Sequence, residues 1–153
     1  MVQGLSHITF IVRDLERMEQ ILTNVFGAKK VYDSGLETFS LSKERFFLIG
    51  SEGEAVWVAT MEGEELPTRS YNHVAFKITD DQYEDYLGRI RSLNLEVREG
   101  RSRVPGEGQS IYFYDDDNHM FELHTGTLQE RLNRYARGRN VLPEKSEEGP
   151  RLE

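Results

Sequence analysis

Hydrophobic and polar positions alternate near the start of the chain, as they do in a half-buried β-strand. Apolar residues at every second position predict the face that points to the core: Ile8, Phe10 and Val12. His7 and Thr9 fall on the opposite face. Asp14 then fits the N-cap of a helix, and Gly27 fits its end. Between them, apolar residues recur at helical spacing and predict the stripe that covers the core face of the strand: Leu15, Met18, Ile21, Leu22, Val25 and Phe26.

The same pattern occurs a second time, because LSHITFIV at residues 5–12 returns as YNHVAFKI at residues 71–78. His73 holds the position of His7, and Asp80 fits the cap of a second helix. The apolar positions of that helix are Tyr83, Tyr86, Leu87, Ile90 and Leu93. A strand with a histidine, then an aspartate, then a helix in the same order indicates a repeated structural unit.

Short strands separated by turn residues follow each predicted helix. In the first unit we expect three or four strands, near residues 30–33, 38–42, 45–49 and 56–61. In the second unit we expect them near residues 95–98, 110–114 and 119–124, the last two joined by a tight turn at residues 115–118. Thr127 and Glu130 resemble a capping box and predict a final helix.

These elements predict one α+β domain over residues 1–136, with a charged and mobile tail at residues 137–153. Within the domain we expect three parts, a first repeat at about 4–62, a second at about 71–125 and a C-terminal helix at about 127–136.

Composition narrows the chemistry. The 153 residues include no cysteine, so imidazole and carboxylate groups would have to hold any metal. A net charge of -8 argues against nucleic acid or an anionic membrane as a partner. Hydrophobic residues make up 37% of the chain, and we find neither a long apolar run nor a leader, so we expect a cytoplasmic protein.

The repeated histidines are candidate metal ligands. His7 and His73 occupy matched positions, and strand parity places Glu122 on the same face of the second unit. Two imidazoles and one carboxylate suit Mn(II), Fe(II) or Zn(II) and leave coordination positions open for water and substrate. His124 shares the face of Glu122 and is a rival ligand, whereas His119, beside a turn, fits a structural role. A lone histidine in a strand is more often a hydrogen-bonded structural residue, and it is the repetition that favours a metal site.

Several segments resemble the vicinal oxygen chelate superfamily and, within it, the fosfomycin-resistance proteins. They are residues 4–9, 71–76, 110–115 and 121–124, and the resemblance covers roughly residues 1–135. It implies two βαβββ repeats that curl into a metal-binding cup. It also implies a domain-swapped homodimer, in which His7 of one chain joins His73 and Glu122 of the other.

The fosfomycin-resistance proteins that this chain resembles include thiol transferases and a branch of epoxide hydrolases, the FosX type. Glu44 matches the residue that distinguishes the hydrolase branch. The resemblance implies a Mn(II)-dependent hydrolase that adds water to the oxirane of fosfomycin and gives an inactive diol phosphonate. Glu44 would be the general base, since ring opening by water needs a group that removes a proton. On turn composition alone, Glu44 fits a solvated charge equally well.

The resemblance also assigns positions around the substrate. It implies that Tyr112 and Arg131 contact the phosphonate, that Thr9 lies near the attacked carbon, and that Tyr71 is an aromatic neighbour of the site. Arg103 would replace a lysine of the thiol transferases. Taken alone, each of these residues also fits an ordinary structural or surface role.

Two other functions fit the same residues. One is a fosfomycin thiol transferase that uses glutathione or another small thiol, and the other is a binding protein that sequesters the drug without catalysis. Thiol dependence would identify the first. Purification without a metal would indicate the second.

Overall fold

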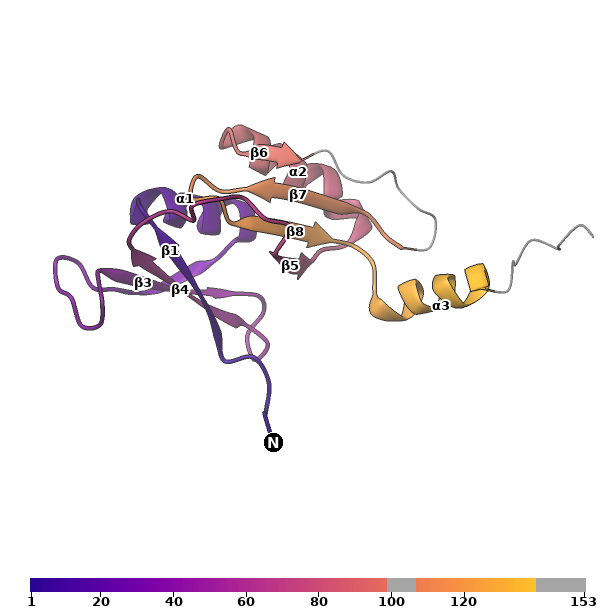
Figure 1. Cartoon of the computed structure of the whole chain (residues 1–153), viewed down its shortest axis with the longest axis horizontal. Helices are drawn as coiled ribbons and strands as arrows, with labels where there is room; N and C mark the ends of the chain where they lie inside the picture. Colours follow the sequence, from indigo (N-terminus) through magenta and orange to yellow (C-terminus); the bar gives the residue numbers. More distant parts are fainter. Residues whose placement is uncertain (99–106, 140–153) are drawn as a thin grey trace, which may run out of the picture.

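The structure is a computed structural model that describes residues 1–98 and 107–139 (Figure 1). Its elements, in chain order, are β1 (His7–Val12), α1 (Leu15–Phe26), β2 (Lys29–Asp33), β3 (Glu44–Ile49), β4 (Val56–Glu62), β5 (His73–Lys77), the 3-10 turn η1 (Asp80–Gln82), α2 (Tyr83–Ser92), β6 (Glu96–Arg98), β7 (Ser110–Tyr114), β8 (Met120–His124) and α3 (Leu128–Arg139).

The strands form two four-stranded sheets of the same design, with the orders β1-β4-β3-β2 and β5-β8-β7-β6. In each sheet the histidine-bearing strand lies at one edge and pairs in parallel with the last strand of its unit. The other pairings are antiparallel. Each unit is therefore a βαβββ repeat, which confirms the fold class expected from the sequence.

Local signals placed most helix ends correctly. The Asp14 carboxylate accepts a hydrogen bond from the backbone N–H of Arg17 at 3.0 Å, so Asp14 is the N-cap of α1. Gly27 ends the helix with φ of 64°, in the left-handed region that favours glycine. Asp80 was the wrong cap for the second unit. Thr79 is the N-cap of the 3-10 turn η1 that precedes α2, and its backbone N–H donates to the side chain of Gln82 at 3.0 Å. Gln82 is the N-cap residue of α2 and makes no side-chain cap hydrogen bond.

The expected strand at residues 38–42 does not form, and the chain runs through bends between β2 and β3 instead. The segment alternates polar and apolar residues as a strand does. In the structure β3 pairs with β2 on one side and with β4 on the other, and residues 38–42 pair with neither β3 nor the free edge of β2. Three large apolar side chains of this connection are consequently exposed: Leu36, Phe39 and Leu41.

Helix α1 of the first repeat packs against the sheet of the second. The ring of Phe26 lies 4.9 Å from that of Phe76, 5.4 Å from that of Phe121 and 6.0 Å from that of Phe113, centroid to centroid. Phe10 of β1 reaches Phe121 at 5.1 Å. These residues belong to a single apolar cluster that spans both repeats, so neither repeat has a core of its own.

A set of charged contacts fixes the β7–β8 turn to the start of α1. The carboxylate of Asp117, which is nearly buried, accepts hydrogen bonds from Nε of Arg13 at 2.8 Å and from its backbone N–H at 3.1 Å. Arg17 pairs with Asp116 and donates to the carbonyl of Leu93 at 2.7 Å. The two repeats are thus joined by polar contacts between residues about a hundred positions apart, in addition to the shared core.

No helix among the described residues has both the length and the apolar character needed to cross a bilayer.

Replacing Asp117 by alanine removes both acceptor contacts to Arg13 from this junction. We expect the free energy of unfolding to fall by about 1–3 kcal/mol, because a buried charged acceptor and its donors are separated. Urea denaturation measures the change. Asp81→Ala, at an exposed aspartate of η1, is the control and should alter the stability by less than about 0.5 kcal/mol. Equal stability of the two variants would show that the apolar core alone holds the repeats together.

Candidate active site

The first sheet carries three predicted site residues on one face. Strand register places Trp57 of β4 beside His7 and Ala59 beside Thr9, and Glu44 of β3 lies opposite Met61, the next residue on that face of β4. The side of β1 that bears His7 and Thr9 is open, whereas its other side, with Phe10 and Val12, is buried against α1. The parity expected from the sequence is therefore confirmed.

His7 is oriented by two neighbours. Its Nδ1 lies 3.1 Å from the hydroxyl of Ser6, and its ring packs against the indole of Trp57 with centroids 4.4 Å apart and ring planes tilted by 36°. Because the hydrogen bond occupies Nδ1, the second ring nitrogen, Nε2, is left for a ligand. The indole N–H of Trp57 is buried and has no hydrogen-bond partner among the described residues.

Glu44 is not the solvated turn residue that its local sequence allows, since only 9% of it is exposed. Ser34 fixes the backbone of Glu44 by two hydrogen bonds. The Ser34 hydroxyl accepts from the N–H of Glu44 at 3.0 Å, and the backbone N–H of Ser34 donates to the carbonyl of Glu44. Within the described residues, the carboxylate itself makes neither a hydrogen bond nor an ion pair. The adjacent Arg45 is held elsewhere, by Glu16 and Glu19 of α1. Glu44 thus keeps its oxygen lone pairs free for water or substrate.

The second sheet brings His73 and Glu122 together. Nε2 of His73 lies 2.8 Å from Oε2 of Glu122, whose side chain is buried. Nδ1 of His73 lies 2.7 Å from the carbonyl oxygen of Tyr71, and only an N–H can donate to that oxygen. This bond fixes a proton on Nδ1 and turns Nε2, the ring nitrogen that could bind a metal ion, toward the carboxylate. An imidazole nitrogen and a carboxylate oxygen therefore lie side by side, as two donors of a candidate metal site.

Ser110 is a site residue that the sequence did not single out. Its hydroxyl lies 2.6 Å from Oε1 of Glu122 and 2.9 Å from Nδ1 of His124, so it links the two side chains. Ser110 lies two residues before Tyr112 on β7, on the same strand face, and this parity was the available signal. His124 does share the face of Glu122, but its Nδ1 is engaged by Ser110. His119 has the structural position expected of it, with Nδ1 2.7 Å from the buried carboxylate of Asp115.

Two tyrosines border the carboxylate. The hydroxyls of Tyr71 and Tyr112 lie 3.2 Å apart, and the guanidinium of Arg98 stands over the Tyr71 ring at 5.3 Å. Burial, followed by hydrogen bonds to Tyr71 and Glu122, raises the pKa of the Tyr112 phenol above its ordinary value. Tyr112 therefore stays protonated and can donate a hydrogen bond to an anion.

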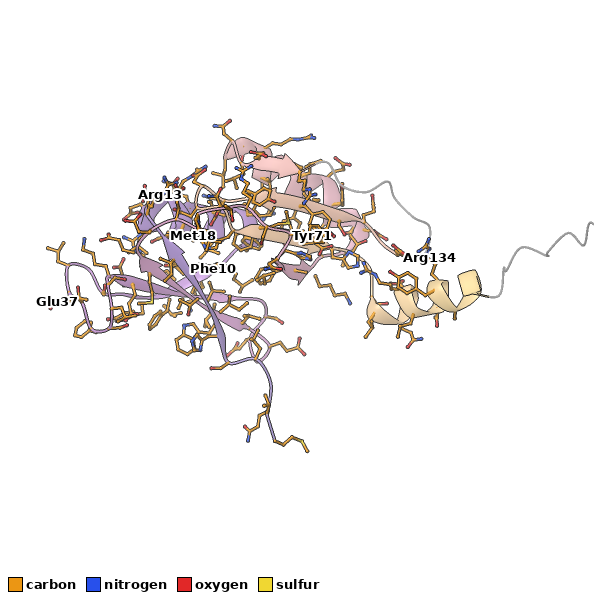
Figure 2. The ribbon with its side chains drawn as sticks, in the orientation of Figure 1. Phe10, Arg13, Met18, Glu37, Tyr71 and Arg134 are labelled. Carbon is orange, nitrogen blue, oxygen red and sulfur yellow. The ribbon has the colours of Figure 1, made fainter. Side chains whose placement is uncertain are left out.

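The chain thus carries two partial sites on two different sheets, one with His7, Thr9 and Glu44 and one with His73 and Glu122. Residues 1–98 and 107–139 contain no group of three or more potential ligands close enough to hold one metal ion. Figure 2 shows Tyr71 beside the second sheet and Arg134 on α3, the helix that also carries Arg131.

Arg103, the expected replacement for the transferase lysine, lies outside the described residues.

Residues 4–123 match the family model of the glyoxalase/bleomycin resistance protein/dioxygenase superfamily. The chain belongs to this superfamily.

Two relatives show which group of the superfamily this chain belongs to. A fosfomycin resistance protein FosX of Mesorhizobium japonicum is 63% identical over 138 residues, which cover 90% of this chain and 96% of the relative. A more distant relative, the metallothiol transferase FosB of Staphylococcus saprophyticus, is 34% identical over 139 residues, covering 88% of this chain and 85% of that protein. The identity to FosX places the chain with the FosX proteins.

A solved structure agrees in fold and contains ligands. It is a mutant FosX from Listeria monocytogenes in complex with Mn(II) and 1S,2S-dihydroxypropylphosphonic acid, and it superposes with a TM-score of 0.78 at 50% identity. The match covers 88% of this chain and 99% of that one.

The single tryptophan of the chain reports on this site, because the ring of Trp57 packs against that of His7 at 4.4 Å. We expect Mn(II), which is paramagnetic, to quench the tryptophan fluorescence saturably and a chelator to restore it. His7→Ala should abolish the saturable quenching, whereas Glu54→Gln, at an exposed loop carboxylate, should leave it unchanged. Saturable quenching that persists at the same affinity in His7→Ala would place the ion away from His7.

Proposed function

We propose that this protein is a Mn(II)-dependent epoxide hydrolase that opens the oxirane of fosfomycin with water and so confers resistance to the drug. The observation that carries the proposal is the buried carboxylate of Glu44, without a partner among the described residues, on the sheet face that bears His7. The 63% identity to a FosX protein supports it. So does the FosX complex, because its dihydroxypropylphosphonic acid is the diol that water addition to an epoxypropyl phosphonate would give.

The metal would be held by a two-fold homodimer, with His7 of one protomer joined by the partner subunit's His73 and Glu122. Each imidazole has Nδ1 engaged and Nε2 available, and nitrogen and carboxylate donors suit Mn(II). Division of the ligands between two sheets of the same chain supports a shared site, since the common core turns these faces outward. When bound, Mn(II) would supply Lewis acidity at the oxirane oxygen.

The side chains would then divide the reaction between them. Glu44 takes a proton from the attacking water as the new C–O bond forms and the ring C–O bond breaks. Protonation of the released oxygen completes the diol. Thr9 lies on the same face as Glu44 and would border the attacked carbon.

The phosphonate needs donors of its own, since a dianion has to be held in a chain with a net charge of -8. Tyr112, kept protonated by its raised pKa, and Arg131 would donate to it. Tyr71 would form the aromatic border, and we retain Arg103 as a further cation. We propose the cytoplasm as the compartment in which the reaction takes place.

Glu44→Gly should reduce turnover by about a hundredfold or more, because the attacking water loses its base. Phosphorus NMR of fosfomycin with Mn(II) and no thiol measures the conversion to diol. Glu37→Gln, at an exposed glutamate of the preceding loop, is the control and should retain wild-type activity. Mn(II) affinity, followed by Trp57 quenching, should be unchanged in both variants.

Two outcomes would contradict this assignment. Full diol formation by Glu44→Gly would remove Glu44 from the mechanism. Conversion of the drug by wild-type protein only after glutathione or another thiol is added would make the protein a transferase, the activity in the name of its FosB relative.

Mixing two inactive variants tests the shared site. His7→Ala and Glu122→Ala should each be inactive as homodimers, but a heterodimer of the two contains one complete site and one site lacking both ligands. After co-refolding at equal concentrations, half of the dimers are mixed, so activity should return to about one quarter of the wild-type value.

Size-exclusion chromatography confirms that dimers have formed. The matched control is a mixture of His73→Ala and Glu122→Ala, whose defects fall in the same half-site and whose mixed dimers should stay inactive. Absence of recovery in the first mixture would mean that the ligands come from one chain.

A further inference from the structure

Helix α3 is not held to the rest of the chain by its apolar residues. Leu128 is 73% exposed, Leu132 50% and Tyr135 45%. Figure 1 shows α3 extending beyond the end of β8, away from the two sheets. Within the described residues, its direction must therefore be set by contacts other than a hydrophobic interface.

One such contact is an ion pair between Arg134 of α3 and Glu107, which precedes β7. Only 3% of Glu107 is exposed, whereas the arginine side chain is 39% exposed. A carboxylate this deeply buried needs a cation, and Arg134 of α3 supplies one.

The backbone beside Glu107 is tightly packed against the start of α3. A Cβ atom added at Gly108 would lie 2.4 Å from the backbone nitrogen of Gly126, and one added at Gly126 would lie 2.5 Å from the carbonyl oxygen of Glu107. Gly108 also has φ of +76°, which disfavours any other residue. Gln109 and Thr125 extend the β7–β8 pairing up to this point, since the N–H of Thr125 donates to the carbonyl of Gln109 at 3.0 Å. The backbone at Glu107 is thus held rigidly next to the β7–β8 hairpin.

Arg131 lies on the same face of α3 as Arg134. The two residues are three positions apart, so their side chains project in similar directions. Thr127 and Glu130 cap the helix, with the Thr127 hydroxyl donating to Glu130 at 2.8 Å, and the first turn that carries Arg131 is therefore ordered. Whatever fixes Arg134 also fixes the rotation of the helix and the direction of Arg131.

We propose that Glu107 and Arg134 are positioning residues: their ion pair sets α3 so that Arg131 reaches the phosphonate of the substrate. The inference rests on the proposed function, in which Arg131 is a phosphonate donor. Neither member of the pair needs to contact the substrate, because the effect is exerted through Arg131.

Arg134→Ala should raise the KM for fosfomycin about tenfold and leave kcat within about a factor of two, since ground-state binding of the phosphonate is weakened while Glu44 and the metal ligands are untouched. Arg134→Lys, which keeps the charge, should recover part of the loss. Arg137→Ala, at an exposed arginine of the same helix, is the control and should change neither constant. Mn(II) affinity by Trp57 quenching should be the same in all variants.

The double variant Arg131→Ala/Arg134→Ala distinguishes positioning from an independent contribution. If Arg134 acts through Arg131, the double variant should have the KM of Arg131→Ala alone. A KM raised by the product of the two single effects would overturn the proposal. So would an unchanged KM in Arg134→Ala.

Other failures can be told apart from this one. Absence of diol formation by the wild-type protein would end the proposed function before any variant is made. An unchanged KM in Arg131→Ala would remove this inference and leave hydrolysis by Glu44 standing. Should Arg134→Ala fail to fold, Glu107→Gln, which nearly preserves the side-chain shape, must raise KM in the same way, and an unchanged value there would overturn the proposal.

Discussion

The packing of α1 between the two repeats is the constraint on which the rest of the structure depends. The ring of Phe26 meets three aromatic rings of the second sheet, so the two sheets share one apolar cluster. Each sheet can bury only one face in that cluster, and on the opposite face the residues of the edge strand, including the histidine, are exposed. The fold thus stabilises a single chain and, by the same packing, leaves it with two partial sites directed away from its core.

Glu44 and Glu122 are both buried, but their contacts differ and suit them to different roles. Glu122 is held by His73 on one oxygen and by Ser110 on the other, which fixes the orientation of its carboxylate. Glu44 is anchored only through its backbone, and its carboxylate has no partner among the described residues. A fixed carboxylate suits metal coordination, whereas a free one near the attacked carbon suits proton removal. The division of roles proposed above follows from these contacts.

Much of this fold was predictable because its signals are local and occur twice. Alternation at residues 7–12 and 73–77 placed both histidines on the face opposite the core, and the helical stripe from Leu15 to Phe26 marked α1 with its ends. The strand expected at residues 38–42 was wrong, since alternation alone cannot show whether a segment pairs with another strand. Thr79, and not Asp80, is the cap residue of η1, because two adjacent residues with cap-forming side chains compete for one cap position.

By itself, the sequence determined the repeat, the residue types available as metal ligands and the strand faces, since periodicity, composition and parity can be read from the sequence alone. Only the tertiary structure decided that Glu44 is buried and that its carboxylate has no partner within residues 1–98 and 107–139. It also decided that Ser110 joins Glu122 to His124 and that Glu107 pairs with Arg134 of α3. Each of these features depends on residues from different segments of the chain. Their distances depend on how strands and helices pack, which no local pattern encodes.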